Sequence, residues 1–569
     1  MDKRLDKRFF LALFLSLIVI AITQFLFPSP KQIPAVPMTA QDSAASIREV
    51  APNTGTVPVV RSDSATVGGL TSPVPAPGVV ATPVAGAIVA ETTSVVTPKA
   101  RYQFSSIGAA PVSIVISAYQ NRSPGGGPVD LAVRGAPLLG YRLVLPADTV
   151  ALDRVPFRMS RTAVPGGGEQ LRYDATVGTT GVVINYAIPA DTLASYTMKV
   201  TGTLTGITGQ AFLLVDLPKT LRSAESDTAA DYQSLAYSFK PTRDRAGSVL
   251  FDKLDPGEKR LQPGPLTWVA VKNKYFVLGM LALKDGVPFS EVTLTGGPRL
   301  TNIANTASAT AVQALRNNGF AFEMYAGPQE SQRLMALGRE FDTVNPYGWG
   351  FMQGMVHPIA SKVIEALLWM HNRLNLSYGW VLVILGILIR LALWPLNQST
   401  MRSSLKMQEL QPKLAAVQKK YKDNPLKQRE AIMAVYSEAG VSPFAGLTGC
   451  LPALLPMPIL FALFFVFQNT IEFRGVPFLW LHDISIKDPF YILPILMGLS
   501  MYVLSWIGMR NAPPNPQAKM MMYMFPVMMT AVLLNMASGL NLYYTAQNVA
   551  ALPQQWLLAR ERARVRAAV

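Results

Sequence analysis

Long uncharged hydrophobic runs alternate with polar segments at the start of the chain and again from about residue 378 to its end. Phe9–Phe27 has 19 residues without a charge, Phe444–Ile471 has 28 and Met520–Ala559 has 40. A helix of 19 residues is about 28 Å long, enough to cross the hydrocarbon core of a bilayer. The run of 40 is too long for one span and divides at NMASGLN, residues 535–541. The pattern predicts six transmembrane helices: Phe9–Phe27, about 378–397, one within Phe444–Ile471, about 489–509, and two within Met520–Ala559.

Basic residues are unevenly distributed among the segments between these spans. Residues 398–443 carry eight Lys and Arg, 510–519 carry two and 560–569 carry four, whereas 471–488 carries two. Four more precede the first span, within MDKRLDKR. Because cytoplasmic loops are enriched in Lys and Arg, both termini are predicted to lie in the cytoplasm. A cleaved signal peptide is the alternative for residues 1–27, but the apolar run is longer than usual and ends in FPSP, which favours an uncleaved anchor.

The pattern changes between the first two predicted spans. Residues 28–100 are rich in Pro, Ala, Ser, Thr and Val with little periodicity, which predicts a disordered linker. Residues 101–335 contain short β-rich runs such as VSIVISAY and TMKVTGTL, separated by turn sequences such as SPGGGP. They predict one antiparallel β-sandwich-like domain, which the anchor would export across the membrane. No catalytic constellation is visible in it, so a binding or scaffolding role is expected.

An amphipathic segment precedes the second span. Within residues 345–376, apolar residues such as Ile359, Val363 and Leu367 recur at helical spacing, with Lys362 and Glu365 between them. Aromatic residues cluster at its start. The segment predicts a helix lying in the membrane interface, with packing against the β domain as the alternative.

Composition excludes several classes of protein. Charged residues make up 15% of the 569 residues and hydrophobic residues 50%, whereas soluble proteins carry about a quarter charged residues. The net charge of +16 lies beside the predicted spans, so direct nucleic-acid binding is not expected. Cys450 is the one cysteine, the three histidines are far apart, and no phosphate-loop, GxSxG or HExxH motif occurs. We therefore expect no enzyme activity, no cofactor and no metal.

The segment between the second and third spans, residues 398–443, predicts a cytoplasmic helical hairpin. KDNP at 422–425 interrupts it, and LKQREAIMAVYSEAG forms the second helix. A solvated basic loop is the alternative. The first helix carries a heptad seam able to meet a partner or an emerging chain, spaced 3, 4, 3 and 4 residues apart: Met407, Leu410, Leu414, Val417 and Tyr421.

One charged residue lies inside a predicted span. Arg390, in GILIRLALWPL, is six residues before Leu396 and therefore about 9 Å from that end, in the cytoplasmic half. Snorkelling to the inner headgroups would satisfy the charge without function. The functional interpretation is a water-filled groove, in which Gly386 leaves room above the guanidinium and Trp394 stacks on it.

Three further residues are candidates for the groove. Gln468 is a polar residue of the third span, and an interhelical hydrogen bond explains it equally well. Tyr543 and Tyr544 would line the groove from the last span, or would be ordinary interface aromatics. The other spans carry no Asp, Glu or Lys, which weakens a proton- or ion-coupled transporter.

Several ordered motifs resemble the YidC/Oxa/Alb family of membrane protein insertases. They are IRLALWPLNQST followed by ELQPKL, GCLPALLPMPILFALFFVF, HDISIKDPFYILPILMG and SGLNLYYTAQN. The anchor, β domain and six spans together resemble the YidC type of Gram-negative bacteria. Arg390 matches the family arginine through its surrounding residues, and Tyr543 and Tyr544 match the family LYY.

The resemblance implies the architecture and the role of the chain. It implies a polytopic α-helical membrane protein of the cell inner membrane, with six transmembrane helices and a large exported β domain of the β-supersandwich type. The implied parts are an anchor (1–27), a five-helix insertase core (378–558) and a basic cytoplasmic tail (559–569). The implied function is insertion and chaperoning of nascent membrane proteins, alone or with the Sec translocon, through a hydrophilic groove open to cytoplasm and lipid.

Membrane lipids are further expected partners, and the ribosome is a candidate partner. Two other classes remain as alternatives. One is a polytopic solute transporter or channel, and the other is a scaffold whose β domain does the main work.

Overall fold

The structure of the chain is a computed structural model. It describes residues 90–569, apart from gaps at 147, 165–166, 191–195, 300–301, 346–352, 396–397, 399–409, 411–412, 415, 423, 439–456, 510–515 and 568–569. The predicted anchor and all but the end of the predicted linker lie outside the described residues.

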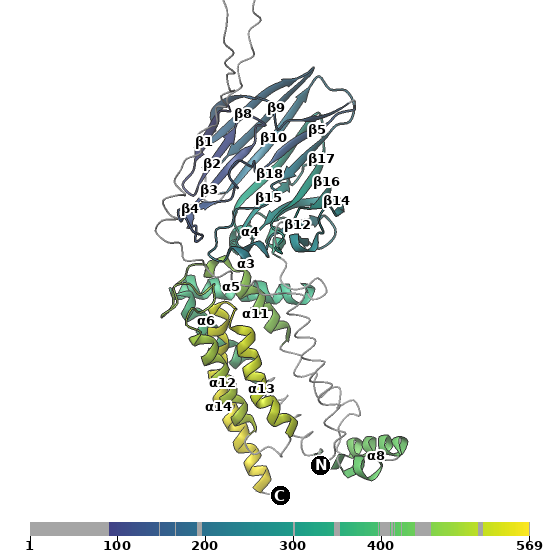
Figure 1. Ribbon diagram of the computed structural model, residues 1–569, viewed down its shortest axis with the longest axis vertical. Coiled ribbons are helices and arrows are strands. Elements are labelled where there is room, and N and C mark those ends of the chain that lie inside the picture. The colour runs from purple at the N-terminus through teal and green to yellow at the C-terminus, as the bar shows by residue number, and fades with distance from the viewer. Residues whose placement is uncertain are drawn as a thin grey trace, which may run out of the picture. The chain divides into compact units, whose positions relative to one another are not determined.

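The first half of the described chain forms two antiparallel sheets. A four-stranded sheet has the order β1-β2-β3-β4, and a 14-stranded sheet has the order β6-β5-β11-β17-β16-β14-β15-β18-β10-β9-β8-β7, with β12 and β13 added beside β14 (Figure 1). The strands are β1 Thr92–Val96, β2 Ala100–Ser105, β3 Pro111–Gln120, β4 Pro128–Asp130, β5 Gly140–Val144, β6 Thr149–Ala151, β7 Arg158–Val164, β8 Gly168–Val177, β9 Thr180–Ile188, β10 Thr197–Thr205, β11 Phe212–Leu217, β12 Ala236–Pro241, β13 Gly247–Leu250, β14 Lys259–Lys272, β15 Phe276–Ala282, β16 Phe289–Gly296, β17 Ala307–Ala314 and β18 Gly319–Pro328.

Both sheets contribute to one hydrophobic core. Tyr102 and Ile114 of the small sheet belong to the same buried cluster as Tyr141 and Val200 of the large sheet. In β10 the sequence alternates as predicted: Val200 is buried, whereas Lys199 is exposed. The predicted β-rich domain is therefore present.

The predicted boundaries of the β domain are wrong at both ends. Residues 92–96 were assigned to the linker, but they form β1, whose β-branched residues TTSVV pair with β2. At the other end the domain continues past residue 335. Short helices α3 Thr228–Tyr232 and α4 Ser331–Ala336 and 3₁₀ turns η1 Phe251–Lys253 and η2 Phe341–Val344 complete it. Phe341 packs edge-on against Trp268 at 5.2 Å between ring centroids, so burial of an aromatic ring fixes this end.

The second half of the described chain is helical. Its elements are α5 Gln353–Leu374, α6 Tyr378–Ala392, α8 Pro425–Glu438, α11 Met457–Asn469, η3 Ile471–Phe473, α12 Ile492–Met509, α13 Pro516–Leu533 and α14 Ser538–Ala567. The predicted division of the last apolar run around 535–541 is confirmed, because α13 ends at Leu533 and α14 begins at Ser538. α14 contacts α6 and α12, and α12 contacts α13 (Figure 1).

The lengths of these helices differ from the predicted spans. Among the described helices, Ile492–Met509 is the one that is long and apolar enough to cross a membrane by itself, and Tyr378–Ala392, Pro458–Asn469 and Met522–Leu533 are shorter apolar helices. The second span was expected to reach residue 397, but α6 ends at Ala392. The chain turns at Leu393, and Trp394 and Pro395 are helical again, so the interruption precedes the proline.

The amphipathic segment forms α5, described from Gln353 to Leu374, and residues 346–352 of the predicted segment lie outside the described residues. Val356, Ala360, Ile364 and Leu367 are buried at a spacing of three to four residues. They share a core with α6, α11, α12 and α14, and Trp369 is 60% exposed. The buried face of α5 therefore packs on the helices, rather than on the β domain, which was the alternative.

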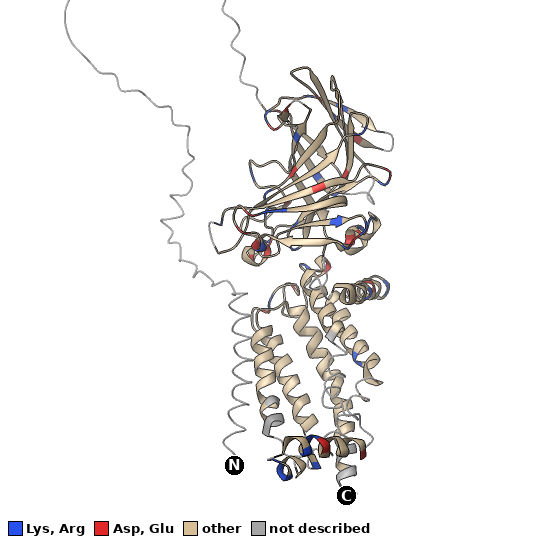
Figure 2. Cartoon of the chain, turned by 90° about the vertical axis from the view of Figure 1, so that its right-hand side faces the viewer, with Lys and Arg blue, Asp and Glu red and all other residues tan. Residues whose placement is uncertain are grey.

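The predicted interruption of the hairpin at KDNP is confirmed. Residues 416–420 are helical, Asn424 donates its backbone N–H to the carbonyl of Tyr421 at 3.2 Å, and α8 begins at Pro425. The side chain of Asn424 accepts a hydrogen bond from the N–H of Lys427 at 3.2 Å and so caps α8. In Figure 2 the long helices are mostly tan, whereas blue and red, which mark Lys, Arg, Asp and Glu, gather on the short helices near the ends of the bundle.

Candidate functional site

Arg390 lies in the last turn of α6. The apolar sequence YGWVLVILGILIRLA forms this helix, and Val381, Leu382, Leu385 and Gly386 are buried on the face that meets the other helices. Arg390 is one turn beyond Gly386 and is partly buried. The helix therefore places a permanent positive charge beside a hydrophobic core.

The guanidinium of Arg390 is held by an amide. Its Nη2 donates a hydrogen bond to Oε1 of Gln554 at 2.9 Å, and Nε2 of Gln554 donates to the backbone carbonyl of Trp394 at 3.2 Å. Gln554 belongs to α14 and is 2% exposed. Nε of Arg390 is buried without a hydrogen-bond partner among the described residues. No carboxylate in the described part of the chain lies within ion-pair distance of Arg390.

The predicted role of Gly386 is wrong. Space at this glycine is not open, because a Cβ there would lie 3.0 Å from the backbone oxygen of Tyr543 and 3.4 Å from Cβ of Ala546. Gly386 therefore allows α6 and α14 to approach closely, as small residues do in membrane helix pairs. Trp394 contributes its carbonyl to the polar cluster, and the predicted stacking of its ring on Arg390 stays a prediction.

Tyr543 and Tyr544 lie at the start of α14, near Gly386. Tyr543 is fully buried, and its ring packs on Phe467 of α11 at 5.3 Å between centroids and on Tyr544 at the same distance. The hydroxyl of Tyr543 is buried without a hydrogen-bond partner among the described residues. Tyr543 thus packs in the helical core next to α6.

Gln468 does not join the cluster around Arg390. Its Nε2 contacts Sδ of Met536 at 3.1 Å, in the connection between α13 and α14. Asn548 makes an interhelical bond, from Nδ2 to Oγ of Ser500 in α12 at 3.1 Å. Of the candidates, Arg390, Gly386, Trp394 and Tyr543 lie along the pairing of α6 and α14, and Gln468 does not.

Gln554 is the residue that sequence reasoning missed. It lies in PQQWLL, inside the 40-residue uncharged run. A neutral amide in such a run does not by itself indicate a functional site. Its position does carry a signal: Tyr543, Gln547 and Gln554 are spaced four and seven residues apart and therefore share one face of α14. In the structure this face of α14 contacts α6 and places Gln554 against Arg390. A single sequence does not reveal that these two helices pair.

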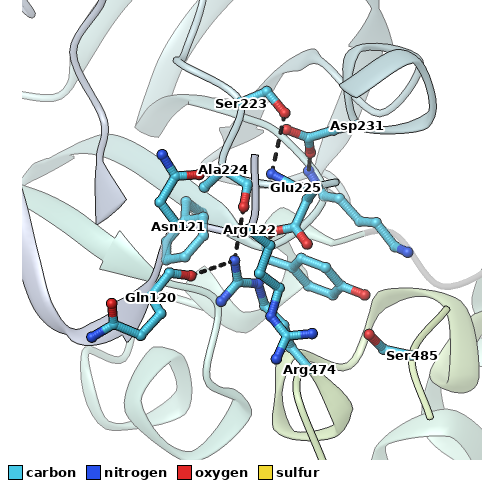
Figure 3. Close-up of polar contacts among 12 residues, drawn as sticks. Gln120, Asn121, Arg122, Ser223, Ala224, Glu225, Asp231, Arg474 and Ser485 are labelled. Atoms are coloured by element: carbon cyan, nitrogen blue, oxygen red, sulfur yellow. Dashed lines mark hydrogen bonds and ion pairs between the residues drawn. The ribbon is translucent and has the colours of Figure 1, made fainter. Parts of the chain in front are cut away.

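A second polar site joins the loop after α11 to the β domain (Figure 3). Arg474, whose side chain is 2% exposed, donates from Nε to Oε1 of Glu225 at 2.7 Å. Its Nη2 donates to the carbonyls of Gln120 at 2.9 Å and Ala224 at 3.0 Å. The guanidinium also lies over the ring of Phe276, 5.7 Å from its centroid. We call these residues and their ion pair the junction.

Neighbouring contacts extend the junction. Arg122 pairs with Asp483 of the same loop, and Glu472 of η3 accepts a hydrogen bond from the N–H of Ser331 at 3.2 Å. Burial raises the pKa of Glu225, although the guanidinium of Arg474 opposes the shift. Burial also raises the pKa of Glu472 to about 7. Among the described residues, no group of three His, Cys, Asp or Glu is placed to hold a metal ion.

The fold and this site define a class: a β domain connected through a charged junction to a bundle of apolar helices, in which Arg390 is partly buried. Comparison with family models is consistent with that class. A model described as "YidC periplasmic domain" matches residues 92–360, and one described as "60Kd inner membrane protein" matches residues 369–565. The chain belongs to the YidC family of membrane protein insertases.

Named relatives are about a third identical to this chain over the aligned residues. The membrane protein insertase YidC of Prosthecochloris aestuarii is 32% identical over 66% of this chain and 66% of its own length. That of Chlorobaculum parvum is 31% identical over 67% of this chain and 69% of its own. That of Chlorobium phaeovibrioides is 36% identical over 52% and 53%. The chain therefore spans just under two thirds of the first relative. These relatives are named for the insertion of membrane proteins rather than for a chemical reaction.

Solved structures give weaker matches. An active YidC insertase with its first transmembrane domain resolved is 17% identical, with a TM-score of 0.32, over 82% of this chain and 92% of that one. YidC from Thermotoga maritima is 13% identical, with a TM-score of 0.28, over 81% and 99%. A galactose mutarotase-like protein from Lactobacillus casei is 10% identical, with a TM-score of 0.30, over 42% and 100%.

Proposed function

We propose that this chain inserts nascent membrane proteins into the inner membrane and assists their folding, alone or with the Sec translocon. Family membership supports the proposal, and so do the named relatives, which are membrane protein insertases. The observation that carries it within the molecule is Arg390, a cation held by a neutral amide at the edge of an apolar helical bundle.

The topology proposed is six spans with both termini in the cytoplasm and the β domain in the periplasm. The positive-inside pattern of the loops supports it. In this topology α6 runs inward, so Arg390 lies toward the cytoplasmic side, and the junction lies on the periplasmic side.

The mechanism proposed involves no covalent chemistry. A polar or acidic segment of a client would otherwise cross hydrocarbon with unsatisfied groups, at a cost of several kcal/mol for each. Arg390 and water in a groove open to the cytoplasm would shelter that segment partway. The apolar helix of the client would then move into lipid, driven by burial of its surface at about 25 cal/mol per Å². The groove residues proposed are Arg390, Gly386, Trp394, Gln468, Tyr543 and Tyr544, with Gly386 in the close-packing role described above.

Two features shape this proposal further. α6 has 15 residues, about 22 Å of helix, which is shorter than a typical span and would thin the bilayer locally.

In the cytoplasmic hairpin, Leu410 is buried while Leu414, Val417 and Tyr421 are partly buried, and Met407 lies outside the described residues. We propose that this seam meets emerging clients or the ribosome.

Replacement of Arg390 tests the proposal. In a strain depleted of its own insertase, Arg390→Ala should reduce insertion of a client whose exported segment carries acidic residues by about fivefold, the effect of one partly exposed charge interaction. Arg390→Lys keeps the charge and should retain part of the activity. Insertion of the acidic client by Arg390→Ala at the wild-type level would refute the role of the charge. Flux of a small solute through reconstituted vesicles would instead support a transporter.

A further inference from the structure

Gln554 occupies a place that few residue types can fill. Its amide accepts a hydrogen bond from Nη2 of Arg390 at 2.9 Å and donates one to the carbonyl of Trp394 at 3.2 Å. Only a side chain with both a donor and an acceptor at its end can make this bridge, and an ionised carboxylate cannot donate. The bridge crosses from α14 to the end of α6.

The bridge fixes the guanidinium without cancelling its charge. A carboxylate at this position would form an ion pair with Arg390 and neutralise it, as buried Asp and Glu usually do for buried Arg. A neutral amide stabilises the same group by a charge-assisted hydrogen bond and leaves a net positive charge. Because Gln554 is 2% exposed, water does not replace it easily as the partner of Arg390.

The remaining donors of Arg390 are not all engaged. Nη2 bonds to Gln554, whereas Nε is buried without a partner among the described residues. An unpaired buried N–H is unfavourable, so an anionic or carbonyl group that reached it would be stabilised by the new hydrogen bond. Such a group is what the polar segment of a client would bring.

We propose that Gln554 is a positioning residue, which holds the guanidinium of Arg390 toward α14 and preserves its charge for acidic segments of client proteins. The inference rests on the proposed function and adds a residue and a specificity to it. With Gln554 in place, Arg390 would favour clients whose exported segment carries negative charge. The hydrophobicity of the client's transmembrane helix would not affect this preference.

Two matched clients and two variants test the inference. The clients are one single-spanning protein with three Asp residues in a short exported segment and the same protein with Asn in their place. Gln554→Glu pairs with Arg390 and should lower insertion of the Asp client about fivefold, as Arg390→Ala does, while the Asn client inserts normally. Gln554→Met keeps the volume, loses the bridge and should lower insertion of the Asp client less.

Gln555 supplies the matched control. It neighbours Gln554 on α14, but its side chain lies toward Gly508 of α12, where a Cβ on that glycine would be 3.3 Å from Oε1 of Gln555. Gln555→Met should insert both clients at the wild-type level. The accumulation of each variant in the membrane is measured by immunoblot. If Gln554→Glu does not accumulate, the comparison of the two clients is made with Gln554→Met alone.

The outcomes separate the inference from the proposed function. If Arg390→Ala impairs the Asp client but both Gln554 variants insert it normally, the inference is overturned and the proposed function stands. If the Gln554 variants reduce both clients equally, Gln554 is a packing residue and the inference is again overturned. If Arg390→Ala inserts the Asp client normally, the inference fails together with the proposed role of the Arg390 charge.

Discussion

At the scale of single residues, the central contact is an arginine bound by a glutamine. The sequence alone singled out Arg390, because a charge inside an apolar run costs free energy and therefore needs an explanation. It did not single out Gln554, because an amide in an uncharged run costs little and many of them form ordinary interhelical bonds. Only the pairing of α6 with α14 connects the two, and pairing is a long-range property that helical periodicity does not encode.

Gly386 provides a stability prediction at this scale. Gly386→Val should destabilise the helical bundle by about 1–3 kcal/mol, because the new side chain meets the backbone of α14 rather than a movable side chain. Thermal unfolding in detergent measures the loss. The control is Gly508→Val, whose Cβ meets only the end of Gln555 and should change stability less. Equal effects of the two substitutions would show that α6 and α14 do not rely on close approach at Gly386.

At the scale of elements, the predicted and observed structures agree where short-range sequence decides. The division at 535–541, the turn at KDNP and the alternation in β10 follow from local turn and periodicity signals. The early start of the β domain at β1 and its late end at η2 do not, because both depend on pairing or packing with distant segments. The end of α6 at Ala392 was not predicted, and Pro395 does not explain it, because Trp394 and Pro395 are helical again after the turn at Leu393.

Glu472, in η3, should make the thermal stability of the protein depend on pH. The carboxyl of Glu472 has a usual pKa of 4.5, and burial, together with the nearby charge of Glu330, raises this pKa to about 7. Since the folded state binds this proton more tightly than the unfolded state, the stabilisation is complete below about pH 4.5 and is lost as the pH rises through 7. The wild-type protein should therefore unfold at a lower temperature at pH 8 than at pH 5.5.

Glu472→Gln isolates this effect from those of other acids. Glu225 and Asp231 also have raised pKa values and will leave some pH dependence in the variant. The difference between wild type and Glu472→Gln should be about 2–4 °C larger at pH 8 than at pH 5.5, in favour of the variant. A difference that does not change between the two pH values would contradict the assignment.

At the scale of the whole molecule, the junction connects the β domain to the loop between α11 and α12. Arg474 is enclosed by Glu225, two carbonyls and the ring of Phe276, so its charge is fully desolvated. Loss of one partner leaves the other charge buried and unpaired, which costs more than the pair contributes. The ion pair therefore couples the loop after α11 to the β domain. Removing only one of its two charges should destabilise this connection more than removing both.

The junction predicts an asymmetry between single and double substitutions. Arg474→Ala should destabilise the connection by about 3–5 kcal/mol, because Glu225 remains buried, whereas Arg474→Ala with Glu225→Ala should recover part of the loss. Limited proteolysis of the full chain in detergent, read at the loop after α11, measures the connection. A double variant that is cleaved faster than the single one would rule out an unpaired charge as the cause.

Crosslinking from the polar site to a client tests the central claim most directly. A photoreactive amino acid replaces Tyr544, beside Tyr543 and close to the pairing of α6 with α14, and in a control it replaces Val527 of α13, which is 71% exposed. Ribosome-bound membrane protein chains of increasing length are then offered. The account predicts crosslinks from position 544 at the lengths at which the first span of the client emerges, and few from position 527. Equal crosslinking from both positions, or none from 544 at any length, would contradict it.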